Sequence, residues 1–370
     1  MSYRICCAIS GHGFGHLAQT AALVNRLAEV VPDLQVRVIS ALPHALLSRM
    51  LSMAFTSECR TLDVGMMHRS PIHVDLPATV LAMRRLHDHW PQRLAEEKAA
   101  LAAWQPDLLL ADIPYLSIAA AAELSIPSVA LASLSWDAVL ATYFSRQDPE
   151  VEGWWQTMRQ AYARATLALL PTPAILDQHP FPEAEQIGPL ALPGQRRREA
   201  LRQAIGVAND DERPLILVSL GGIPAPQLPI QALARELRCH WLLDLPLPGQ
   251  PGHLHDVTRL RDSWSFADLS ASVDGVVSKP GYGMAVAATT RQIPFLYVRR
   301  GIFPDEPPIC GWLERWGRSL ELSEAHFDRG DWYDPLHELM GRPAKTPPLA
   351  NGAAQGADRI LARFFGRKNA

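Results

Sequence analysis

The stretch SGHGFGHLAQT, residues 10–20, places three glycines and two histidines between a short apolar run and a helix-like pattern. The apolar run, residues 4–9, predicts a buried β-strand, and residues 17–31 repeat apolar side chains at the intervals of a helix. A strand, a glycine turn and a helix in this order open a parallel βαβ unit. The start of such a helix commonly holds an anion.

Three interpretations of this turn are open: a phosphate cradle, a catalytic base, or only a tight bend. Gly11, Gly13 and Gly15 permit positive φ and close approach of the backbone to a ligand. If the helix starts near Gly15, His16 occupies its first turn, where the positive helix end disfavours imidazolium. A neutral histidine is suited to act as a general base. His12, in the preceding loop, is the second candidate, and two loop histidines bonded only to the backbone would fit the same letters.

Short β-rich runs alternate with longer helical patterns along the chain, which predicts parallel sheets covered by helices on both faces. The expected strands of the first half are residues 4–9, 35–42, 108–112, 128–132 and 167–170. After a proline- and glycine-containing linker the alternation restarts, with expected strands at 215–219, 240–243, 275–277 and 295–298. We therefore expect an α/β protein of two Rossmann-like doubly wound domains that face a central cleft, with ligands beyond the carboxyl ends of the strands.

The length of 370 residues agrees with more than one domain. We expect an N-terminal domain at residues 1–190, a C-terminal domain at 191–348, and a closing helix at 349–370 that crosses back to the first domain. A formal net charge of −3 provides no basic field for nucleic acid or acidic membranes. The five scattered cysteines form no CxxC pair, and no segment has the character of a signal peptide or a membrane span, so we expect a cytoplasmic protein without a zinc site.

Two further glycine turns follow predicted strands in the second half. The first, SLGGIPAP, contains Gly221 and Gly222, and is either a phosphate-binding turn or a plain strand-to-helix connection. In the second, SKPGYGM, a helix start at Gly281 would leave the backbone N–H groups of Tyr282, Gly283 and Met284 free to bind an anion. Lys279 is either a phosphate partner or a surface cation.

Four motifs in one order carry a resemblance to a known family: SGHGFGH (residues 10–16), LSWD (134–137), KPGYG (279–283) and VRRGIFPDEP (298–307). Together they resemble the N-terminal portion of L-arabinokinases and their single-module bacterial relatives. That portion is itself similar to GT-B glycosyltransferases. The galactokinase-like half of arabinokinases is missing here, and no kinase-type phosphate loop replaces it, so sugar phosphorylation is not expected.

The resemblance implies roles for residues that match the motifs. His16 matches the base that receives the proton of the acceptor hydroxyl. The Gly281 turn matches the site of the donor diphosphate, and Asp305 and Glu306 match the positions that contact the hydroxyls of the donor sugar. Phe266, with Trp264 nearby, falls where the nucleobase usually lies.

One position departs from the family pattern. The glutamate that binds both ribose hydroxyls is replaced by Ala287, whose methyl group accepts no hydrogen bond. The function favoured by the resemblance is transfer of a sugar from a nucleotide-diphosphate sugar, by family habit a UDP-sugar, to an acceptor hydroxyl of undetermined identity, with no metal and no tightly bound cofactor. The alternatives are a non-catalytic nucleotide or sugar sensor, which Ala287 favours, and a nucleotide-sugar epimerase.

Overall fold

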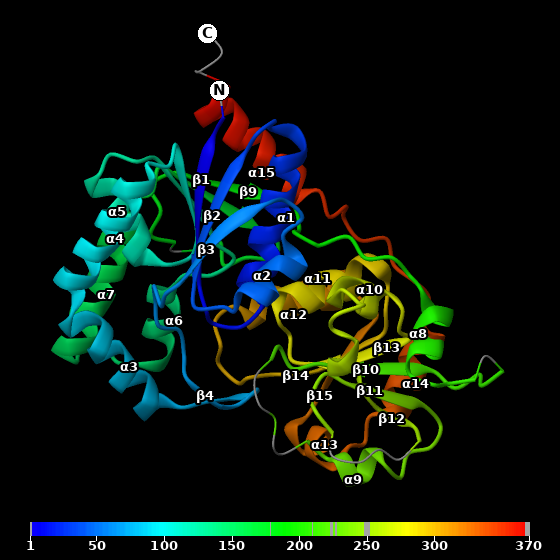
Figure 1. Cartoon of the computed structure of the whole chain (residues 1–370). Coiled ribbons are helices and arrows are strands. Elements are labelled where there is room, and N and C mark those ends of the chain that lie inside the picture. The colour runs from blue at the N-terminus through cyan, green and yellow to red at the C-terminus, as the bar shows by residue number, and fades with distance from the viewer. Residues whose placement is uncertain are drawn as a thin grey trace.

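The structure is a computed structural model that describes residues 2–177, 179–208, 210–222, 225, 228–247 and 252–366. Within these ranges the strands form two large parallel sheets, of seven and six strands, and one small antiparallel hairpin. Helices cover both sheets, and the two sheets lie in separate parts of the molecule (Figure 1). The predicted α/β class with two doubly wound units is confirmed.

The first sheet has the order β3-β2-β1-β6-β7-β8-β9. All neighbouring strands in it are parallel. Its strands are β1 (Arg4–Ile9), β2 (Gln35–Ser40), β3 (Phe55–Cys59), β6 (Leu108–Asp112), β7 (Ser128–Leu131), β8 (Leu167–Pro171) and β9 (Ala184–Ile187). The central strands are apolar along their whole length because helices cover both faces.

Seven helices within the described part of the first half surround this sheet, and two of them start at a side-chain cap. The seven are α1 (Gly15–Val30), α2 (His44–Met50), α3 (Leu76–Asp88), α4 (Trp90–Trp104), α5 (Tyr115–Glu123), α6 (Trp136–Tyr143) and α7 (Pro149–Tyr162). The side chain of Asp75 caps α3 and that of Asp148 caps α7, each helix having proline in its first turn. The hairpin β4 (His68–Ser70) and β5 (His73–Val74) precedes α3.

The second sheet has the order β12-β11-β10-β13-β14-β15, which is the Rossmann order, and it is parallel throughout. Its strands are β10 (Leu215–Val218), β11 (His240–Leu243), β12 (Leu254–Asp256), β13 (Gly275–Ser278), β14 (Phe295–Val298) and β15 (Ser319–Leu322). The helices of this half are α8 (Arg198–Ala204), α9 (Ile230–Leu233), α10 (Phe266–Ala271), α11 (Tyr282–Arg291), α12 (Glu306–Trp316), α13 (Glu324–Arg329) and α14 (Tyr333–Gly341), with a 3-10 turn at Val257–Leu260.

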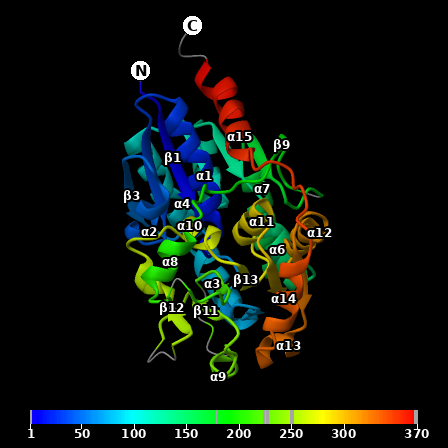
Figure 2. The same ribbon diagram turned by 90° about the vertical axis from the view of Figure 1, so that its right-hand side faces the viewer.

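The last helix, α15 (Gly352–Ile360), lies beside α1 and β9 of the first half, as two views at right angles show (Figure 2). The amide of Gly188 donates to the Gln355 side chain at 2.7 Å, and a π-helical turn (Leu361–Phe365) continues the helix. There the Phe365 ring stacks on Tyr3 at 4.1 Å. The domain borders at residues 190 and 348 stay predictions.

Candidate active site

In each large sheet the spatial order of the strands reverses at one point. Ligands commonly bind at this point in such folds. In the first sheet this point lies between β1 and β6, where Ile9 pairs with Asp112. In the second it lies between β10 and β13, where Val218 pairs with Val277. The turns beyond these strand ends face each other, because a Cβ atom on Gly13 would lie 3.9 Å from the carbonyl oxygen of Gly221.

His16 lies in the first turn of α1 and is held by a carboxylate from the next strand. Its Nδ1–H donates to Asp112 Oδ1 at 2.7 Å, and Thr20, one turn further along α1, donates to Asp112 Oδ2 at 3.0 Å. All three side chains are buried. This bond fixes the imidazole tautomer and leaves Nε2 as the nitrogen that can accept a proton.

The charge environment of His16 differs from what the helix end alone predicts. Burial lowers its pKa, but the charge and the hydrogen bond of Asp112, with the charges of Asp63 and Asp305, outweigh burial and raise the pKa above the ordinary value. The neighbouring carboxylates thus favour the imidazolium that the helix end was expected to disfavour. The imidazole can hold a proton once it has accepted one, because Asp112 stabilises the imidazolium.

His12 is built into the wall of the site. Its Nε2–H donates to the carbonyl oxygen of Met66 at 2.8 Å and lies 3.2 Å from Nε2 of His68. Its ring meets Trp136 edge-on at 5.1 Å. Burial, with the charges of His68, His16 and Lys279, holds the pKa of His12 well below its ordinary value. These contacts favour a positioning role over proton transfer.

Two buried carboxylates near His16 escaped the sequence interpretation. Asp112 ends a strand that was predicted, and its place beside the first strand follows from the doubly wound order, so this signal was available. Asp63 accepts from Ser10 Oγ at 3.0 Å and from Trp136 Nε1 at 2.7 Å. It comes from an irregular loop, and no pattern in the sequence connects it to the first glycine turn.

The glycine turn before α11 forms the helix start that the sequence predicted. Gly281 is the N-cap residue and provides no side-chain cap, and the first helical bond runs from Ala285 N to Gly281 O at 2.9 Å. The preceding N–H groups, of Tyr282, Gly283 and Met284, are thus left for another acceptor. A Cβ on Gly283 would lie 3.9 Å from Ala18 of α1, so this helix start borders the first half.

The side chains of Tyr282 and Met284 do not take part in this helix start. Met284 is buried in the core. The Tyr282 hydroxyl donates to the Thr172 carbonyl at 3.0 Å and accepts from the Leu190 amide at 2.9 Å. Tyr282 therefore ties the second sheet's helix to the end of the first half.

Lys279 lies beside the second glycine turn, where Gly221 and Gly222 have φ of +76° and +77°. A Cβ on Gly221 would lie 3.2 Å from Lys279 Cε, and one on Gly222 would lie 2.5 Å from the ring of Phe14. Only glycine fits at both positions. Burial and the charge of Arg300 lower the pKa of Lys279 to about 7, and its ammonium has no hydrogen-bond or ion-pair partner among the described residues.

The acidic pair Asp305 and Glu306 is occupied by a neighbouring arginine. Arg300 donates from its backbone N and from Nε to Glu306 Oε1, both at 2.8 Å, and from Nη2 to Asp305 Oδ1 at 2.6 Å. The residue expected to contact the nucleobase, Phe266, begins α10 and is 44% exposed. Trp264 is buried under the guanidinium of Arg197, 4.1 Å from its ring centre.

The two halves exchange apolar side chains across the site. Phe303, from the loop after β14, is buried in the core cluster of the first half, and Ile72, from the β4–β5 hairpin, is buried in a core cluster of the second. An ion pair between His73 and Glu324 at 2.9 Å joins the same hairpin to α13. The two halves are therefore in direct contact beside the site.

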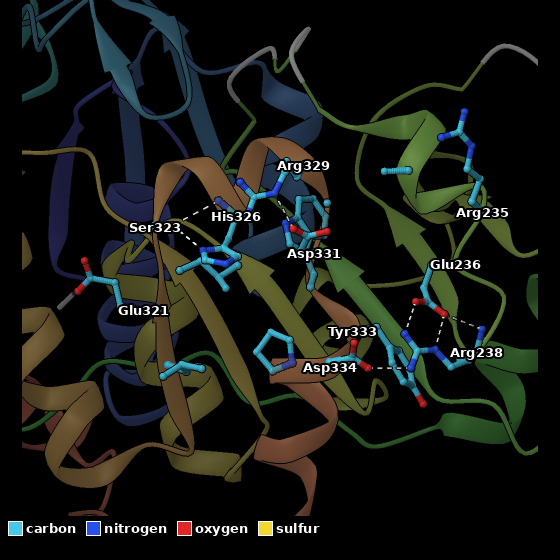
Figure 3. Close-up of a pocket in the computed structure, with 16 residues that line it drawn as sticks. Arg235, Glu236, Arg238, Glu321, Ser323, His326, Arg329, Asp331, Tyr333 and Asp334 are labelled. Carbon is cyan, nitrogen blue, oxygen red and sulfur yellow. Dashed lines mark hydrogen bonds and ion pairs between the residues drawn. The ribbon is translucent and has the colours of Figure 1, made fainter.

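A separate hollow of about 710 Å³ lies beside α9, α13 and α14. Figure 3 shows the side chains that line it. Its charged side chains are largely paired with one another: Arg238 bonds to Glu236 and Asp334, and Arg329 to Asp331. Among the described residues that line it, none was predicted for the site. It contributes nothing to the arrangement around His16.

Neither a metal site nor a membrane span is found in the part of the chain that the structure describes. No three side chains of histidine, cysteine, aspartate or glutamate in these ranges are grouped so that they could hold a metal ion. No helix in them has both the length and the apolar character that crossing a bilayer requires.

The fold is that of the GT-B glycosyltransferases. The glycosyltransferase of kitacinnamycin matches with a TM-score of 0.65 at 16% identity, covering 98% of this chain and 99% of that one. CalG4, the calicheamicin glycosyltransferase, matches with 0.61 at 17% identity and 99% of each chain. Phytolacca americana UGT2, complexed with UDP-2-fluoro-glucose and pterostilbene, matches with 0.59 at 14% identity and 100% of each chain.

In sequence, the chain is similar to L-arabinokinase of Arabidopsis thaliana, with 23% identity over 372 residues. The match covers 95% of this chain and 33% of that protein, so the chain spans about a third of the length of this relative. No family model matches the chain.

Proposed function

We propose that the protein transfers a sugar from a nucleoside diphosphate sugar, in the first place a UDP-sugar, to the hydroxyl group of an acceptor. The observation that carries this proposal is the His16–Asp112 pair, which lies at the carboxyl edge of the first sheet and faces the second half. Phytolacca americana UGT2, with the same fold, is described in complex with a UDP-sugar and pterostilbene, which supports the substrate class.

In the proposed reaction the acceptor hydroxyl gives its proton to Nε2 of His16, and Asp112 stabilises the imidazolium that forms. The acceptor oxygen forms a bond to the anomeric carbon of the sugar. The bond from that carbon to the diphosphate oxygen breaks, and its electron pair leaves with UDP. The N–H groups at the start of α11, with Lys279, receive the charge of the diphosphate.

The chain divides the work between its two halves in this proposal. We assign the acceptor and the base to residues 1–190 and the donor to residues 191–348. We assign to residues 349–370 the return of the chain to the first half. The exposed Phe266 would lie against the base. In the turns, Gly11, Gly13, Gly15, Gly221 and Gly222 allow the two halves to approach the ligand with their backbones.

The donor site is tested by Gly283→Val. Its branched side chain would project between α11 and Ala18, where the diphosphate is expected, and would hinder close approach to the helix N–H groups. We expect calorimetry to show UDP binding to the parent protein and at least tenfold weaker binding to this variant. The matched control is Gly311→Val in α12, where a Cβ meets nothing within 4 Å and UDP affinity should stay unchanged. Equal UDP affinity in all three proteins would place the diphosphate elsewhere.

A second candidate function is a nucleotide or sugar sensor, and Ala287 favours it. Ala287 lies one helical turn after Gly283 on the partly exposed side of α11, where the resemblance implies a ribose-binding glutamate. Next to it, Arg291 donates to the carbonyl oxygen of Leu192 at 3.2 Å, so the region contains a cation in place of a carboxylate. Release of the sugar from a UDP-sugar by the protein would contradict the sensor.

The missing carboxylate can be restored with Ala287→Glu. If the ribose lies over this turn, two hydrogen bonds to a charged group should tighten UDP binding by roughly tenfold or more. Ala287→Gln is the control, because it has the same length without the charge and should gain less. Calorimetric titration with UDP measures both variants. An unchanged or weaker complex with the glutamate variant would show that the ribose is bound elsewhere.

A further inference from the structure

Two hydrogen-bond donors without a partner in the described part of the chain lie around Phe303. The ring of Phe303 lies 4.0 Å from the guanidinium carbon of Arg300, meets Tyr143 edge-on at 6.0 Å, and stacks at 6.5 Å on His68. The Tyr143 hydroxyl is buried and has no hydrogen-bond partner among the described residues. The ammonium of Lys279, whose charge acts on His68 and His12, has none either within the same ranges.

The two carboxylates of this region are already bonded to arginines. Both Asp305 and Glu306 receive hydrogen bonds from Arg300, and Glu306 is also within 3.4 Å of Arg299 Nε. Asp305 and Glu306 are buried, so they do not turn toward solvent for other partners. A neutral sugar hydroxyl that donates to Asp305 Oδ1 or Glu306 Oε1 would compete with Arg300 for that oxygen, whereas an anionic group would meet donors without partners.

A buried hydroxyl without a hydrogen-bond partner is costly, and a half-buried ammonium without one has lost part of its hydration. Burial raises the pKa of Tyr143 to about 12, and the nearby charges of Arg300, Glu306 and Asp305 also act on it, so Tyr143 stays a donor at neutral pH. Lys279 has its pKa lowered to about 7 by burial and by Arg300, and an anion beside it would restore the charge. Both groups gain most from a ligand oxygen that carries negative charge.

We propose that this site binds an anionic group on the sugar side of the reaction, a carboxylate or a phosphate, between Lys279 and Tyr143 and beside Phe303. The inference rests on the proposed transferase function and narrows its substrate class. The group belongs either to the transferred sugar, as in a nucleoside diphosphate uronic acid, or to the acceptor, as in a sugar acid or sugar phosphate. Arg300 supports binding of the anion, because its charge neutralises that of Asp305 and Glu306.

Matched ligand pairs test this proposal in two arms. In the donor arm, UDP-glucuronate is compared with UDP-glucose and UDP-galacturonate with UDP-galactose, since each pair differs only at the carboxylate. In the acceptor arm, glucuronate and glucose 6-phosphate are compared with glucose in the presence of saturating UDP. Calorimetry gives the ratio of affinities within each pair. We expect the anionic member to bind at least tenfold more tightly in one arm, and that arm identifies the source of the anion.

The variants Tyr143→Phe and Lys279→Gln should bring this ratio close to one. The ratio is the decisive quantity, because any contact of Lys279 with the diphosphate cancels within a donor pair. UDP affinity itself should be unchanged in Tyr143→Phe, which also shows that the variant is folded.

Equal affinity for anionic and neutral members in both arms, with UDP bound, would overturn the anionic site and leave the transferase proposal standing. Preference for free sugar acids or sugar phosphates without any binding of UDP or UDP-sugars would support the anionic site and overturn the transferase proposal. A preference that survives both substitutions would also overturn the assignment to Lys279 and Tyr143.

Discussion

Replacing His16 with alanine is expected to lower turnover by roughly 10²–10⁴-fold, the usual contribution of a positioned proton acceptor. The reason is that the buried imidazole has one nitrogen committed to Asp112 at 2.7 Å and the other free to receive a proton. UDP affinity should barely change, because the proposed donor site belongs to the other half. Turnover is measured as sugar transfer, or as release of UDP from the donor where the acceptor is not known.

His12→Ala is the matched control for this prediction. Its Nε2–H already donates to the Met66 carbonyl and its ring packs on Trp136, so its loss should disturb the wall of the site and lower turnover less. A near-normal rate in the His16 variant together with a lost rate in the His12 variant would reverse the two roles. If neither substitution affects turnover, the first glycine turn is only a bend and the sensor gains support.

The central strands of both sheets could be predicted from the sequence because helices bury them on both faces. β1, β6, β11 and β14 have the bounds that their apolar runs predict. β3, β9, β12 and β15 were not predicted, and each lies at an edge of its sheet. An edge strand needs fewer apolar side chains, as FTSEC in β3 illustrates, so hydrophobic runs do not reveal it.

The candidate site was partly predictable for the same kind of reason. Glycine turns after strands indicate positions where a backbone approaches a ligand, and the turn before α11 is such a helix start. A local sequence pattern does not show which side chains will form hydrogen bonds or ion pairs with one another. The resemblance implies that Asp305 and Glu306 contact the hydroxyls of the donor sugar, and it does not reveal that the fold brings Arg300 onto both. Likewise, Tyr282 is part of the motif, but its side chain joins the two halves.

Replacing Asp112 with asparagine is expected to cost turnover nearly as much as loss of His16, by roughly 10²-fold or more, because the amide no longer stabilises the imidazolium or selects the tautomer. The pH profile should move as well. Asp112 raises the pKa of His16 above its ordinary value, and the base works only when it is neutral, so activity of the parent protein falls as pH drops through this raised pKa. Without the carboxylate, burial lowers the pKa, and the acid limb of the profile moves to lower pH.

Thr20→Val is the control that distinguishes the charge of Asp112 from the hydrogen bond that holds its carboxylate. This variant keeps the carboxylate and removes only the hydrogen bond of 3.0 Å to its Oδ2, so the acid limb should stay close to that of the parent protein and the rate should fall much less. The measurement is the rate of transfer, or of UDP release, between pH 5 and 9 for the three proteins, with the His16 imidazole titrated by nuclear magnetic resonance. A fall in rate for Asp112→Asn without a downward shift of the imidazole pKa would mean that Asp112 supports the fold of the site and not the charge of its base.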